Sequence, residues 1–332
     1  MKQAKNKKKA ASGRKPVARK APARKAKPKP RQLPQAADLE SLLAKSLAYS
    51  TKDLSDAAVI EDLIYALTPS MSRAAYNFGY SIGMEIRSSS KKEDNLLIPA
   101  LRRLGFRHIK YYPFIDALAI NAGSKKYPAI NIGARIHFFE SGIIAGYLSA
   151  HSGEPINTIE KECIYYGNKE CRFVSYPGRV LKEHTPPSIE DVIDAIATHM
   201  HGIKFSSRSE AEYHMLPMLP MAKQPLRSEV TKLLYLIGIE ISQRHMSEDP
   251  REILENLARY FGMSGESIEI KQKSASAKLS CSYYNSNADM AELSVAMLRG
   301  FIKGRTSKEP NVYINIDKNM NYVIELTTAV HK

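Results

Sequence analysis

Between residues 38 and 104, apolar residues recur at helical spacing. The stripe formed by Ala75, Phe78, Ile82 and Ile86 is typical of a helix with one face on a core. Gly105 is a common residue just past a helix end. The pattern predicts helices over about 38–47, 55–67, 71–86 and 94–104.

The hydrophobic period shortens after Gly105. The changed pattern predicts strands over 106–112 and 115–121. Helical spacing returns over 136–150, and two further strands are predicted over 156–166 and 171–176. A Gly167-Asn168 turn separates the last two strands. Gly142 and Gly146 share one face of the predicted helix, and we expect that face to pack closely on the sheet.

Ser188 and Asp191 resemble a capping box, which predicts the start of another helix. After this helix, the pattern of the first half repeats. Three segments of the first half recur in the same order, about 155 residues later. They are Tyr80-Ser-Ile-Gly-Met-Glu-Ile as Tyr235-Leu-Ile-Gly-Ile-Glu-Ile, Leu101-Arg-Arg-Leu-Gly as Leu257-Ala-Arg-Tyr-Phe-Gly, and Gly146-Tyr-Leu as Gly300-Phe-Ile. The repeat predicts two tandem units of α+β class, each with helices on one face of an antiparallel sheet.

Charge is concentrated at the N-terminus. Of 49 Lys and Arg residues in the chain, 14 fall within residues 1–35, which contain no Asp or Glu. A cationic segment rich in Pro and Ala cannot bury enough apolar surface to offset the entropy of ordering, so we expect a disordered arm. Its cations suit DNA or RNA phosphates. The residues we expect to bind nucleic acid are Lys7, Lys8, Lys9, Arg14, Lys15, Arg19, Lys20, Arg24, Lys25, Lys27, Lys29 and Arg31.

These boundaries divide the chain into four parts. We expect a disordered arm over 1–36, a first unit over 38–178, a linker with a helix over 179–204 and a second unit over 205–330. No apolar run is long enough for a transmembrane segment, and the N-terminus lacks the apolar core of a secretory signal. Three cysteines, an odd number, favour a reducing compartment. We expect a cytoplasmic protein, nucleoid-associated if the arm holds DNA.

Cys163 and Cys171 flank the Gly167-Asn168 turn, so a hairpin would bring their sulfur atoms close together. Three interpretations remain open from the residues alone. The two thiols could be buried and inert, they could form a disulfide, or they could supply half of a metal site. The compartment disfavours the disulfide, and the spacing is not one of the common zinc pairs.

A longer motif contains this pair. It runs Phe139-Glu-Ser-Gly-Ile-Ile-Ala-Gly-Tyr-Leu148, then Glu160-x-x-Cys163, then Gly167-Asn-x-x-Cys171-x-Phe173. It resembles the signature of the vinyl-4-reductase (4-vinyl reductase) domain. That family includes a protein of bacteriochlorophyll synthesis, the sensor domains of aromatic-responsive bacterial activators and many archaeal proteins. Its fold is similar to that of subunits of the transport-protein-particle vesicle-tethering complex. The resemblance covers about 40–178, and 205–330 only through the repeat.

The resemblance implies a metal site. Metal-binding domains of the family use a residue at the start of the long helix, a glutamate and two cysteines. The matching residues here are His137, Glu160, Cys163 and Cys171. The first position is usually cysteine in the aromatic sensors, and histidine is an equally good zinc ligand. Four protein ligands imply structural zinc. The second unit lacks this set, and Cys281 is expected to be a small buried residue.

Three functions compete. The first is a nucleic-acid-associated regulatory or scaffold protein that senses a small ligand or binds a partner. The second is a reductase-type enzyme of tetrapyrrole or related metabolism, although the sequence shows no redox-cofactor motif and we assign no catalytic residue. The third is a membrane-surface or trafficking-type adaptor. A ligand pocket in the first unit is expected near His108, Tyr111 and Tyr112, and the units are expected to form a homodimer or an intramolecular pseudo-dimer.

Overall fold

The structure, a computed structural model, describes residues 41, 44–45, 47–48, 55–89, 95–114, 117–122, 131–178, 186–200, 226–281, 288–319 and 321–328. The predicted arm over 1–36 and its cations lie outside these residues. Among the described residues, no helix is both long and apolar enough to cross a membrane.

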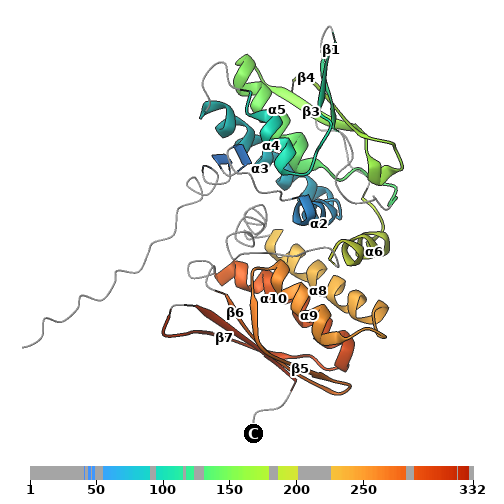
Figure 1. The fold of residues 1–332 in the computed structure, drawn as a ribbon, viewed down its shortest axis with the longest axis vertical. Helices are drawn as coiled ribbons and strands as arrows, with labels where there is room; N and C mark the ends of the chain where they lie inside the picture. The colour runs from blue at the N-terminus through green and yellow to red at the C-terminus, as the bar shows by residue number, and fades with distance from the viewer. Residues whose placement is uncertain are drawn as a thin grey trace, which may run out of the picture. The chain divides into compact units, whose positions relative to one another are not determined.

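The first half places three helices before a four-stranded sheet (Figure 1). The helices are α2 (Ser55–Tyr65), α3 (Pro69–Ser88) and α4 (Leu97–Arg103). Strands β1 (Lys110–Phe114) and β2 (Ala117–Ala122) follow, then α5 (Phe138–Ser152), β3 (Ile156–Glu162) and β4 (Cys171–Pro177). The strands are antiparallel in the order β1-β2-β4-β3.

The second half has a similar succession of elements (Figure 1). After α6 (Ile189–Met200) come α8 (Leu226–Arg244), α9 (Pro250–Tyr260), β5 (Ser264–Lys271) and β6 (Ser274–Cys281). They are followed by α10 (Ala288–Thr306), β7 (Asn311–Ile316) and β8 (Tyr322–Thr327). Its antiparallel sheet has the order β5-β6-β8-β7, which is the order of the first sheet. The predicted α+β class is confirmed; the duplication itself stays a prediction.

Glycines set the distance between the long helices of the first half. A Cβ added to Gly83 would lie 2.1 Å from the carbonyl oxygen of Ile143, and one on Gly146 would lie 1.9 Å from that of Tyr80. Such distances leave room only for hydrogen, so α3 and α5 pack backbone to backbone. We predicted that Gly142 and Gly146 would face the sheet; that was wrong, because they face α3. A single sequence shows which residues share a helix face but not what that face meets.

The same close packing occurs between α8 and α10. A Cβ on Gly238 would lie 2.0 Å from the carbonyl oxygen of Met297, and one on Gly300 would lie 1.9 Å from that of Tyr235. Gly238 and Gly300 belong to the segments that repeat Gly83 and Gly146 in the sequence. The repeated motifs therefore include residues that bring two helices together in each half.

Several predicted boundaries shift. The strand predicted over 106–112 begins only at Lys110. Phe106 lies before the strand and is fully buried. The strand predicted over 156–166 ends at Glu162 and is followed by a 3-10 helix, Ile164–Tyr166. The N-cap part of the predicted capping box is confirmed: the Asp191 backbone N–H donates to the Ser188 hydroxyl across 3.1 Å, and that hydroxyl donates to the Asp191 carboxylate across 2.6 Å.

Candidate metal centre

Three elements of the first half bring the four predicted ligands together. His137 is the residue directly before α5, Glu160 lies in β3, and Cys171 is the first residue of β4. Cys163 follows β3 and precedes the 3-10 helix. Glu160 is paired with Phe173, and Cys171 lies two residues from Phe173, so the Glu160 and Cys171 side chains share one face of the sheet.

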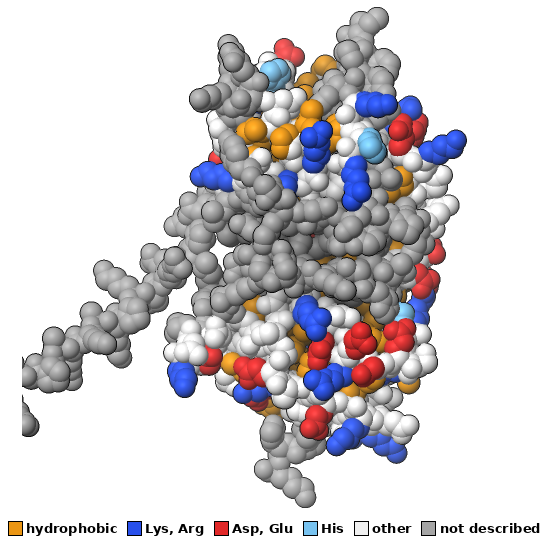
Figure 2. Space-filling view, in the orientation of Figure 1, with side chains coloured by type: hydrophobic (Ala, Val, Ile, Leu, Met, Phe, Trp, Pro, Cys, Tyr) orange, Lys and Arg blue, Asp and Glu red, His pale blue; other side chains and the backbone are white. Residues whose placement is uncertain are grey.

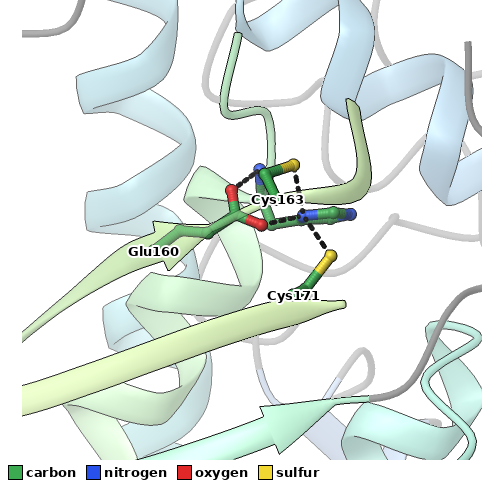
Figure 3. Close-up of side chains that lie close together, drawn as sticks. Glu160, Cys163 and Cys171 are labelled. Carbon is green, nitrogen blue, oxygen red and sulfur yellow. Dashed lines mark hydrogen bonds and ion pairs between the residues drawn. The ribbon is translucent and has the colours of Figure 1, made fainter. Parts of the chain in front are cut away.

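The four side chains converge on one point (Figure 3). One ligand atom from each residue lies within 4.8 Å of all the others. His137 Nδ1 is 2.5 Å from Glu160 Oε1, 3.6 Å from Cys163 Sγ and 3.7 Å from Cys171 Sγ. The backbone N–H of His137 also donates to Glu160 Oε2 across 3.3 Å. The imidazole nitrogen Nδ1 therefore faces both sulfur atoms and the carboxylate.

Aromatic rings enclose the imidazole. The His137 ring centroid lies 5.2 Å from that of Phe106, 6.1 Å from that of Tyr165 and 6.2 Å from that of Phe173. All four ligands are buried, and Cys163 and Cys171 are fully inaccessible. The rings fix the plane of the imidazole and exclude water, so a cation there would be held by the protein atoms alone.

A tight turn holds Cys163 in place. Its backbone N–H donates to Asn168 Oδ1 across 2.9 Å, and its carbonyl oxygen accepts from the Asn168 backbone N–H across 3.0 Å. Gly167 adopts φ +90°, the left-handed region that favours glycine. The Ile132 backbone N–H donates to the Tyr165 carbonyl across 2.9 Å. The segment before α5 is therefore attached to the turn that carries the first cysteine.

The donor distances can be compared with those of a tetrahedral zinc site. Zn–N of about 2.05 Å and Zn–S of about 2.3 Å correspond to N–S edges of about 3.6 Å. The two measured Nδ1–Sγ distances, 3.6 and 3.7 Å, match that edge. The Nδ1–Oε1 distance of 2.5 Å is an ion-pair contact, shorter than the N–O edge of about 3.4 Å, so the Glu160 carboxylate would have to move away from the imidazole. The two imidazole–sulfur edges therefore fit zinc as they stand, and the carboxylate fits after that movement.

The Cys163 thiol resists ionisation where no cation is present. Burial raises the pKa of Cys163, and the hydrogen bond with Cys171 and the charge of Glu160 raise it further, whereas His137 lowers it. A buried thiolate needs a compensating positive charge. A divalent cation at the centre of the four ligand atoms would supply one.

The structure leaves the predicted ligand pocket untested and places Cys281 as expected. His108 is exposed, and Tyr111 and Tyr112 lie in β1 with side chains outside the described residues, so the expected ligand pocket stays a prediction. Cys281 is buried in β6, as expected. Among the described residues, the four predicted ligands are the one group of His, Cys, Asp or Glu placed to hold a metal ion.

Sequence reasoning missed the aromatic enclosure. The sequence pattern predicts a strand that begins at Phe106, whereas this residue lies before β1 with its ring against His137. Asn168 was recognised only as a turn residue, and the structure shows its side chain bonded to the backbone of a candidate ligand. The Asn at the second turn position, five residues after the first cysteine, was the available signal.

Comparisons with known proteins give short matches. No protein-family model matches the chain. An uncharacterized protein of Methanocaldococcus jannaschii is 29% identical over 105 residues, which cover 30% of this chain and 61% of that protein. The chain therefore spans about three fifths of the length of that relative.

Two solved structures are also similar. One is a vinyl-4-reductase family protein from Methanocaldococcus jannaschii, with 20% identity, coverage of 32% of this chain and 68% of that chain, and a TM-score of 0.26. The other is the phenol-responsive sensory domain of the transcription activator PoxR with phenol, with 15% identity, coverage of 44% and 76%, and a TM-score of 0.23. The first carries the family name that the sequence motif predicts.

Proposed function

We propose that this chain is a nucleic-acid-associated regulatory or scaffold protein whose first half is held together by a structural zinc ion. The observation that carries the proposal is the convergence of His137, Glu160, Cys163 and Cys171, all buried, within 4.8 Å of one another. Residues from three separate elements meet there.

The donor set favours zinc. Two thiolates select soft or borderline ions, and an imidazole with a carboxylate suits Zn²⁺ in tetrahedral geometry. When bound, the ion supplies positive charge that stabilises two thiolates and a carboxylate. Four protein ligands leave no position for a water molecule, so the role is structural rather than hydrolytic.

The metal would link the β3–β4 hairpin to the start of α5 through ligands from both. His137 directly precedes the helix that packs backbone to backbone on α3, so the hairpin, the sheet and the two long helices would move as one body. A rigid unit of this kind can sense a small ligand or present a surface to a partner. Its cationic arm, residues 1–36, would hold phosphate groups without reading base sequence.

The arm's role is tested by replacing its twelve predicted phosphate-binding Lys and Arg residues with Gln in the full-length chain, the arm-neutral chain. We expect wild type to bind random duplex DNA and RNA with an affinity that falls steeply with salt. The arm-neutral chain should lose about 0.9 of salt slope for each duplex phosphate contact removed. Equal affinity and equal slope for the two proteins would refute a nucleic-acid role for the arm.

A further inference from the structure

The surface around the metal centre carries cations that the proposed zinc site does not use. Arg107, Lys110, Arg135, Lys161 and Lys169 are all exposed, and we call them, together with Tyr166, the hairpin rim. Segments 95–114, 131–136 and 161–172 contain eight Lys or Arg and two Asp or Glu. Figure 2 shows several Lys and Arg side chains near a histidine in the upper part of the molecule, with Asp or Glu side chains beside some of them.

Contacts with the metal centre bring these three segments together. Phe106, next to Arg107 in the chain, packs its ring 5.2 Å from His137. The Arg135 guanidinium donates to the Lys161 carbonyl across 3.2 Å and lies 5.2 Å above the Tyr166 ring. The rim is therefore formed by the loop before β1 and its first residue, by the loop before α5 and by the β3–β4 hairpin.

Within the described residues, the rim cations are not paired with acidic side chains. None of the five forms an ion pair within the described part of the chain. Some exposed cations of the second half are paired instead: Arg251 and Arg259 both pair with Glu255, and Lys278 pairs with Glu266 at 3.0 Å. Within the described residues, the three rim segments therefore carry more Lys and Arg than Asp and Glu.

Tyr166 adds an exposed aromatic ring to the cations of the rim. Its side chain is 50% exposed although Tyr165, its neighbour, is fully buried. The hairpin holds its backbone, because its N–H donates to the Cys163 carbonyl across 3.0 Å. A fixed, exposed aromatic ring among cations suits a nucleic-acid base that stacks while its phosphates meet Lys and Arg. Stacked bases inside a duplex do not offer a free face.

We propose that the hairpin rim binds single-stranded nucleic acid, with Tyr166 stacking on a base and Arg107, Lys110 and Lys169 contacting phosphates. The inference deepens the proposed function, because it adds to the arm a second contact on the folded body and names single strands as its ligand. The metal centre would hold the rim in shape without touching the strand.

The test uses the arm-neutral chain, so that the rim is measured apart from the arm. The probes are a fluorescent single-stranded RNA of mixed sequence and about 20 nucleotides, its duplex, and vesicles with an anionic phospholipid, at two salt concentrations. Within this background, Arg107→Gln with Lys110→Gln and Lys169→Gln should lower single-strand affinity about tenfold and reduce the salt slope by about two. The matched control is Arg251→Gln with Arg259→Gln, which should change neither.

Tyr166 separates stacking from charge. Tyr166→Ala should weaken single-strand binding by about fivefold or more with little change in salt slope, whereas Tyr166→Phe should bind as the parent does. Unchanged affinity in the triple variant, equal binding of duplex and single strand, or binding of vesicles in place of RNA would overturn the proposal. If neutralising the arm abolishes binding and the rim variants have no effect, the rim proposal fails and the arm's role stands. If the rim variants weaken binding and neutralising the arm does not, the arm's role fails and the rim proposal stands.

Discussion

The backbone N–H of Cys163 donates to the side-chain oxygen of Asn168 across 2.9 Å. This bond closes the turn that aims the Cys163 sulfur at the candidate metal centre. We predict that Asn168→Ala lowers zinc affinity about tenfold, because supporting hydrogen bonds commonly contribute that much to metal binding. Asn168→Asp keeps an acceptor oxygen and should lose less. Chelator competition measures both, and Lys169→Ala, the adjacent exposed position, should match wild type; an unchanged Asn168→Ala variant would refute the supporting role.

Close helix packing gives a second prediction. Gly146→Ala would place a Cβ 1.9 Å from the Tyr80 carbonyl oxygen, so α3 and α5 would have to separate. We expect a loss of about 2–3 kcal/mol in the free energy of unfolding, in the upper range for overpacked cores. Urea unfolding tests this, with Asn77→Ala on the exposed face of α3 as the control that should change little. Equal stability of Gly146→Ala and wild type would contradict the packing.

The matching glycine of the second half gives a separate test. A Cβ on Gly300 would lie 1.9 Å from the Tyr235 carbonyl oxygen. Gly300→Ala should therefore destabilise the chain by a similar amount, about 2–3 kcal/mol, without loss of metal. Metal analysis and urea unfolding of the same sample separate the two effects. Metal loss in Gly300→Ala would contradict a site confined to the first half.

A buried carboxyl gives a pH-dependent prediction. Burial raises the pKa of Glu61, the Tyr65 hydroxyl that donates to it across 2.7 Å partly opposes this, and Asp62 and Glu140 raise it further. Because the folded-state pKa lies above the unfolded one, the stability that Glu61 contributes is full below about pH 4.3 and is lost as pH rises through the folded-state pKa.

Glu61→Gln stays neutral at every pH and should therefore gain stability over wild type as pH rises from 5 to 8. Urea unfolding at the two pH values measures the difference. Glu154→Gln, at an exposed position, should show no such trend. A stability difference that does not change with pH would show that Glu61 does not titrate as a buried group.

Local sequence patterns predicted the elements well because each rests on neighbouring residues. The helix stripe through Ala75 and Ile82 and the capping box at Ser188 are both present. The ligand set came from the resemblance to a family motif, and the structure brings those four residues together. The cysteine spacing alone left three interpretations open.

Features built by distant segments were not predictable. The sequence predicts Phe106 as the first residue of a strand, yet it lies before β1 with its ring 5.2 Å from that of His137. The glycine pair of α5 was expected to meet the sheet, but its partner is a helix more than fifty residues earlier in the chain. Periodicity identifies a buried face, whereas the fold decides which surface covers it.

Metal content of the purified full-length protein tests the central claim most directly. The account predicts about one zinc per chain in wild type and in Cys281→Ser, whose cysteine is buried in the second half. It predicts loss of that zinc in His137→Ala and in Cys163→Ser, measured by elemental analysis after dialysis without chelator. Wild-type protein without stoichiometric metal, or full retention of zinc in both ligand variants, would contradict the four-ligand centre.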